Sequence, residues 1–232
     1  MPFGFSVSDI YGGIIIDDTH QQPQLFYSGS ASAAFTHGAP GVVTFAGNVA
    51  DPILFVRAQQ GAVFSIPNVS ESGFSYFCSA GNLEWRVYSA SQMSYGASGY
   101  GLNIYNASGS LIFNSDKVIP RLKDSLVALV SGDIAVGYIG IWVPFSMQLN
   151  LIKSIDFLAV ESGLPFVNAS LLSYITAFNG ATMNAQACAA IKFISTTRVE
   201  IYRLICFGGG NANAPTTAFL LGVYPKYFIS SQ

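Results

Sequence analysis

The chain has 232 residues, of which 51% are hydrophobic and only 9% are charged. Ten basic and twelve acidic residues give a net charge of −2 without a basic cluster, which argues against a nucleic-acid-binding protein or a polybasic membrane anchor. A typical soluble domain has about 25% charged residues. We therefore expect either a surface of uncharged polar side chains on a monomer or, as the favoured alternative, a homo-oligomer that buries part of this surface.

Short apolar segments that alternate with polar residues predict strands through the first hundred residues. The clearest case is Leu83 to Tyr88, where apolar Leu83, Trp85 and Val87 alternate with residues of the opposite face. Strands are expected at residues 3–7, 13–17, 42–45, 53–56, 63–66, 74–78 and 83–88.

The second half of the chain continues this pattern, with one segment that differs. Strands are expected at residues 100–105, 111–114, 126–130, 134–143, 147–152, 199–207 and 218–223. From Ala169 to Phe193 the spacing fits one or two helices, and Ala185 to Phe193 is rich in alanine, a good helix former. The sequence therefore predicts an all-β chain with a β-sandwich or jelly-roll-like fold and a small helical element near 170–193.

The most apolar segment, Ile134 to Phe145, is the best candidate for a membrane span. It has 12 residues, whereas a spanning helix needs about 20. Its glycine, β-branched and aromatic residues favour a buried strand, so no membrane span is expected. The first residues, MPFGFSVSD, lack the basic start and apolar stretch of a signal peptide, which predicts synthesis in the cytoplasm without a secretion signal.

Two segments align without gaps at an offset of 97 residues. They are FGFSVSDIYGGIIIDD (residues 3–18) and YGLNIYNASGSLIFNS (residues 100–115). Each predicts a hairpin whose four-residue turn opens with Asp9 or Asn106, which can bond its own turn backbone, and closes with Gly12 or Gly109, which can adopt positive φ. Either a duplication or the common pattern of β-hairpins explains the match. The offset suggests an N-terminal β-sandwich unit at 1–97 and a C-terminal β-rich unit at 98–232.

The string from Tyr100 to Asp116, YGLNIYNASGSLIFNSD, resembles a signature of siphophage minor tail proteins that associate with the tail tip or tail fibre. The opening residues 4–20 are similar to the start of the same group, whereas the last hundred residues hardly match. The resemblance implies a structural component of a bacteriophage tail, in the tail tip, baseplate or fibre attachment. It also implies a virion protein made in the bacterial host cytoplasm, with other tail proteins as partners and a homo-oligomer, for which tail symmetry suggests a trimer.

Two other functions stay open at this point. A host-receptor-binding module would recognise a surface glycan or protein through exposed Tyr and Asn side chains, although the 12 Tyr residues can equally fill strand faces. A saccharide depolymerase, which is less favoured, would need two converging carboxylates. The candidate acids in the second half are Asp116, Asp124, Asp133, Asp156, Glu161 and Glu200.

Other residue patterns do not predict a reactive centre, so we expect a protein that is not an enzyme and has no catalytic, cofactor-binding or metal-ligating residues. Asp17, Asp18 and His20 are expected to form a solvated strand end, because His37 is the only further histidine that could complete a metal site. The loop 208–213 follows an apolar strand but lacks Walker spacing, which favours a turn. The three cysteines, Cys78, Cys188 and Cys206, are expected to be buried thiols.

Overall fold

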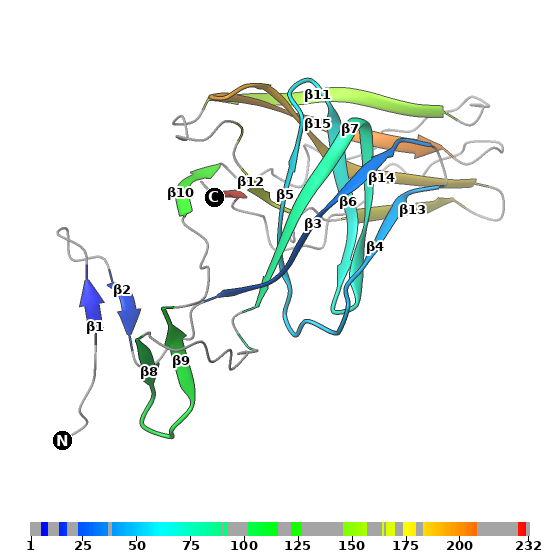
Figure 1. Cartoon of the computed structure of the whole chain (residues 1–232). Helices are drawn as coiled ribbons and strands as arrows, with labels where there is room; N and C mark the ends of the chain where they lie inside the picture. Colours follow the sequence, from blue (N-terminus) through cyan, green and yellow to red (C-terminus); the bar gives the residue numbers. More distant parts are fainter. Residues whose placement is uncertain are drawn as a thin grey trace.

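The computed structural model of the chain is built from strands (Figure 1). It describes residues 6–8, 14–17, 23–36, 39–89, 91, 102–115, 122–126, 146–156, 164, 166–169, 174–179, 183–207 and 227–230. Within these residues there is no helix, which confirms the predicted all-β class. Accordingly, no described segment is a helix long and apolar enough to cross a membrane.

The described strands run through the whole chain and range from three to seventeen residues. They are β1 (Ser6–Ser8), β2 (Ile14–Asp17), β3 (Gln24–Ala34), β4 (Gly41–Thr44), β5 (Ile53–Ala58), β6 (Val63–Ser70), β7 (Gly73–Ser89), β8 (Asn103–Tyr105), β9 (Leu111–Asn114), β10 (Leu122–Leu126), β11 (Ser146–Asp156), β12 (Phe166–Asn168), β13 (Tyr174–Asn179), β14 (Met183–Ser195), β15 (Arg198–Phe207) and β16 (Tyr227–Ser230).

One antiparallel sheet contains twelve of these strands, in the order β10-β16-β12-β5-β7-β6-β14-β15-β11, with β3 and β4 also on β7 and β13 on β14. The long strand β7 lies at its centre and changes partners along its length. Its first half pairs with β6 and β4, and its second half pairs with β5 and β3. Gly81 lies between the two halves with φ +66°, a left-handed conformation that glycine adopts without steric cost.

The main hydrophobic core joins strands that are not neighbours in the sheet. Buried side chains of β5, such as Leu54 and Val56, belong to the same continuous cluster as Ile191 and Phe193 of β14, although β5 and β14 are not neighbours in the sheet. The rings of Phe64 and Phe193 stack with centroids 5.8 Å apart. The core therefore joins residues from both sides of residue 97, and the boundary between units 1–97 and 98–232 stays a prediction.

The predicted helical element near 170–193 is wrong, because the described residues of this segment form β13 and β14. β14 pairs with β15 from Ala185 to Ser195 and with β6 at Ile191 and Lys192. Both faces of β14 are buried. Ala189 lies in the main core, and Ala190 lies in a second cluster on the opposite face. Small alanine side chains allow other residues to pack closely on both faces. A strand buried on both faces lacks polar alternation, and tertiary pairing here overrides the local helix preference of alanine.

The two hairpins related by the 97-residue offset have the same register. Ser6 pairs with Asp17 in β1–β2, and Asn103 pairs with Asn114 in β8–β9. A register shift lies between Val7 and Ser8 in the first hairpin and between the equivalent residues of the second. Both hairpins form separate two-stranded sheets. The sequence match therefore extends to the backbone pairing.

The turn of the second hairpin has the predicted chemistry. The Asn106 side-chain oxygen accepts hydrogen bonds from the backbone amides of Ser108 (3.1 Å) and Ser110 (2.8 Å). Gly109 has φ +80° and donates its N–H to the Asn106 carbonyl (2.9 Å). The corresponding turn of the first hairpin, at residues 9–13, lies outside the described residues.

Most predicted strands are present, with different ends. The strands expected at 74–78 and 83–88 are one continuous strand, β7. Besides β13 and β14, which were predicted as a helix, three strands were not predicted: β3, β12 and β16. β3 is rich in Ser, Gly and Ala, and β12 and β16 are short, so none has a clear alternating pattern. Of the strand expected at 126–130, Leu126 ends β10 and the rest lies outside the described residues, as do 134–143 and 218–223.

Candidate functional site

Most residues considered for chemistry in the sequence are not brought together by the described structure. His20, Asp18, His37 and the loop 208–213 lie outside the described residues, while Asp17 ends β2. Among the carboxylates, Asp156 is exposed and lies 3.9 Å from Arg198, and Asp124 lies in β10. Asp116, Asp133 and Glu161 are outside the described part of the chain. Within that part, no three His, Cys, Asp or Glu residues form a group that could hold a metal ion.

Two further groups on the predicted list have clear structural roles. Cys78 is a buried free thiol, as expected; burial raises its pKa, and the thiol donates to the Ala80 carbonyl over 3.3 Å. Glu200 accepts a hydrogen bond from the Tyr202 hydroxyl. Burial, together with this neighbouring carboxylate, raises the pKa of Tyr202 to about 12. Neither arrangement provides an activated nucleophile, because a raised pKa disfavours the ionised form.

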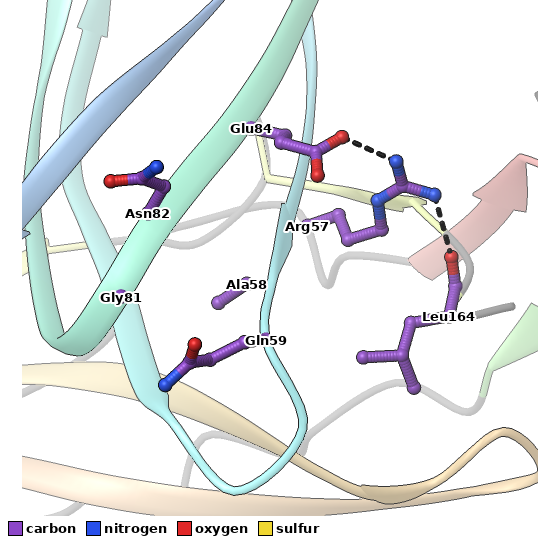
Figure 2. A pocket seen from close by; sticks show the side chains of 7 residues that line it. All are labelled: Arg57, Ala58, Gln59, Gly81, Asn82, Glu84 and Leu164. Atoms are coloured by element: carbon purple, nitrogen blue, oxygen red, sulfur yellow. Dashed lines mark hydrogen bonds and ion pairs between the residues drawn. The ribbon is translucent and has the colours of Figure 1, made fainter.

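A cleft lies where β5 and the second half of β7 meet Leu164 (Figure 2). Its volume is about 470 Å³. Backbone pairing places Arg57 of β5 opposite Glu84 of β7. The residues that line the cleft are Arg57, Ala58, Gln59, Gly81, Asn82, Glu84 and Leu164.

Three contacts hold the Arg57 guanidinium in one position. Its Nη2 forms an ion pair with the Glu84 carboxylate, and its Nη1 donates to the Leu164 carbonyl over 3.2 Å (Figure 2). The guanidinium carbon also lies 4.5 Å from the centre of the Phe166 ring. A cation this close to an aromatic ring is attracted by the ring quadrupole. The cleft therefore has a fixed, charge-paired wall.

An aromatic cluster beneath this wall supports it. Phe166 is only 2% exposed, and the Arg86 guanidinium lies 4.4 Å from its ring centre, so two arginines contact one ring. Phe55 and Tyr88 meet edge to face at 5.4 Å in the same cluster. Burial raises the pKa of the Tyr88 hydroxyl, and the neighbouring Arg86 offsets part of that rise.

The lining determines which ligands fit the cleft. Arg57 and Glu84 neutralise each other, and Gln59 and Asn82 are exposed amides that both donate and accept hydrogen bonds. This combination suits a neutral ligand with several hydroxyl groups. Glu84 is the only carboxylate in the described lining, whereas the common glycosidase mechanism uses two.

A second candidate site is the open edge of the sheet at β11. Within the described part of the chain, β11 pairs with β15 alone and ends the sheet. Two of its leucines are exposed, Leu149 to 39% and Leu151 to 56%. An uncovered strand edge presents unpaired backbone N–H and C=O groups, which another strand can satisfy.

The sequence predicted strands at β5, β7 and β11 but did not predict β12 or either site. The Arg57–Glu84 pair follows from the β5–β7 register, and Phe166 comes from a strand that was not predicted. The sequence had one signal for the Arg57–Glu84 pair. In β7, the charged residues Glu84 and Arg86 alternate with apolar residues and share one face with Tyr88. The edge position of β11 had no local signal, because it depends on which strands pair.

Comparisons with known proteins do not assign this chain to a family. No family model matches it, and no curated protein or solved structure is significantly similar to it.

Proposed function

We propose that this protein is a structural component of a bacteriophage tail that acts through protein–protein assembly. The observation that carries the proposal is the edge strand β11, which pairs only with β15 among the described strands and has exposed Leu149 and Leu151. Exposed apolar side chains on an open strand edge favour association with another chain. The low content of charged residues, 9%, reduces the repulsion that keeps proteins apart.

The tail context comes from the hairpin signature between Tyr100 and Asp116. The repeated register of β1–β2 and β8–β9 supports treating both hairpins as equivalent elements. In this proposal the sheet is a sandwich-like body whose two halves cover the core, and the hairpins and sheet edge are available to other tail proteins. The location is the tail tip, baseplate or fibre attachment of the virion.

Sedimentation velocity of the full chain over a wide concentration range tests the assembly function. We expect the weight-average sedimentation coefficient to rise with concentration, because edge strands become paired. The same measurement with purified tail-tip and baseplate proteins of the phage tests for co-sedimentation. A chain that remains monomeric at every concentration, both alone and with those proteins, would overturn the proposal.

The cleft beside Arg57 favours a second candidate function, which is recognition of a host surface glycan. The support is its charge-paired wall and its exposed amides, Gln59 and Asn82. Aromatic stacking does not contribute, because Phe166 is buried. Hydrogen bonds alone give modest affinity in water.

NMR titration with methyl glycosides of the sugars on the host surface tests this second function. Saturable shifts of the Gln59 and Asn82 side-chain amides are expected in the wild type, and Asn82→Ala should weaken the shift of the Gln59 amide. Asn68→Ala, a change at an exposed asparagine on β6, is the matched control. If no sugar shifts these amides, or if both variants behave alike, the cleft is not a glycan site.

A further inference from the structure

We propose that β11 pairs with β11 of a second copy of this chain, antiparallel and around a twofold axis at Asn150. In this register Leu149 lies opposite Leu151 of the second copy, and Leu151 lies opposite Leu149. The inference rests on the proposed assembly function, since it names the partner that completes the sheet edge.

One edge of β11 is paired, and its other edge has no described partner. β11 has eleven residues, and its paired edge pairs with β15 from Ser146 to Asp156. An antiparallel neighbour continues the pattern of the sheet, in which every described pair is antiparallel. Such a neighbour would satisfy the free backbone groups.

The exposed side chains of the two copies match in this register. A twofold axis at Asn150 relates each residue i to residue 300 − i, so the two exposed leucines of one copy meet the two of the other. Leucines directly opposite across an antiparallel pair lie close enough for their side chains to contact. All four side chains would then lose exposure to water, which is favourable.

The charged residues of β11 also permit this pairing. Lys153 and Asp156 are the only charged residues of β11, and both lie on one side of the axis. The regular segment around the axis, Leu149 to Leu151, contains no charged residue, so like charges do not meet there. Asp156 already lies beside Arg198. A register shift between Leu151 and Lys153 marks the end of the regular segment, because a bulge distorts the pairing beyond it.

A disulfide cross-link through a cysteine introduced on the axis tests this register. Only the residue on the axis faces itself, so the full chain with Asn150→Cys should form a disulfide between two copies under mild oxidation. In a directly opposed pair the Cβ atoms lie about 4.5–5.5 Å apart, which is close to the span of a disulfide. The readout is the fraction of dimer on a non-reducing gel, with the linked peptide identified by mass spectrometry.

Val42→Cys on β4 is the matched control, because Val42 is 72% exposed and lies on a different strand. We expect at least a tenfold higher dimer fraction for Asn150→Cys than for Val42→Cys, with circular dichroism showing that both variants are folded. Equal fractions, or a stronger cross-link from Leu149→Cys than from Asn150→Cys, would overturn the register.

Sedimentation separates failure of this inference from failure of the proposed function. If the wild-type chain associates but Asn150→Cys does not cross-link, the self-pairing is wrong and the assembly function stands. If the wild-type chain forms only a trimer, the twofold pairing is likewise wrong. If it stays monomeric alone and with tail proteins, both proposals fail.

Discussion

Strands β7 and β11 belong to the same sheet, but β7 lies at its centre and β11 lies at its edge. β7 has partners on both sides in each of its halves, whereas β11 has one described partner, β15. The apolar residues of β7, such as Leu83 and Val87, are fully buried, while Leu149 and Leu151 of β11 are exposed. The centre of the sheet therefore holds the buried side chains that stabilise the fold, and the edge holds the exposed side chains on which the proposed association depends.

The largest expected effect is at the centre. Phe64 of β6 is fully buried next to β7 and stacks on Phe193. Phe64→Ala should lower the free energy of unfolding by about 3–5 kcal/mol, because it removes buried apolar surface and leaves a cavity. Urea denaturation followed by fluorescence measures this loss, and Phe64→Leu should lose much less. A loss below about 1 kcal/mol would show that the core does not depend on this ring.

The next effect is at the point where β7 changes partners. Gly81→Ala should cost about 1–3 kcal/mol of unfolding free energy. Gly81 has φ +66°, and a Cβ there would lie 2.3 Å from the Gln59 side-chain oxygen. Gly61→Ala is the control, since Gly61 has φ +85° with open space around it. Thermal denaturation of both variants separates backbone strain from the contact, and a larger loss for Gly61→Ala would contradict this explanation.

A smaller effect is expected at a hairpin that stands apart from the sheet. Asn106→Ala removes the acceptor for the Ser108 and Ser110 amides, which should destabilise the hairpin by about 1 kcal/mol. Hydrogen exchange of these two amides should accelerate, whereas the global denaturation midpoint should not change. Asn106→Asp keeps the acceptor oxygen and should preserve their protection. A clear fall in the global midpoint would show that the hairpin is coupled to the sheet.

The smallest effect on folding is expected at the edge. Leu151→Lys should change the free energy of unfolding by no more than about 0.5 kcal/mol, because Leu151 is already exposed. The same change should abolish self-association in sedimentation velocity, since it places a charge in the proposed pairing. Val42→Lys, at a more exposed site on β4, should associate like the wild type. If Leu151→Lys associates normally, β11 is not the contact.

The comparison between centre and edge also sets the limit of sequence-based prediction. The β8–β9 hairpin was predicted down to its turn, because Asn106, Gly109 and the paired strands lie within a dozen residues of one another. The offset to β1–β2 was equally visible. By contrast, the segment of β14 has the composition of a helix, and its conformation depends on β6 and β15, which lie elsewhere in the chain.

By itself, the sequence determined the all-β class, the position of most strands and the chemistry of one turn, because these follow from side-chain alternation and local hydrogen bonding. The tertiary structure alone decided which strand became the centre and which the edge. It also decided that Arg57 would meet Glu84, Leu164 and Phe166. The physical reason is that strand pairing joins residues far apart in the chain, and backbone hydrogen bonds between strands carry no local signature of the chosen partner.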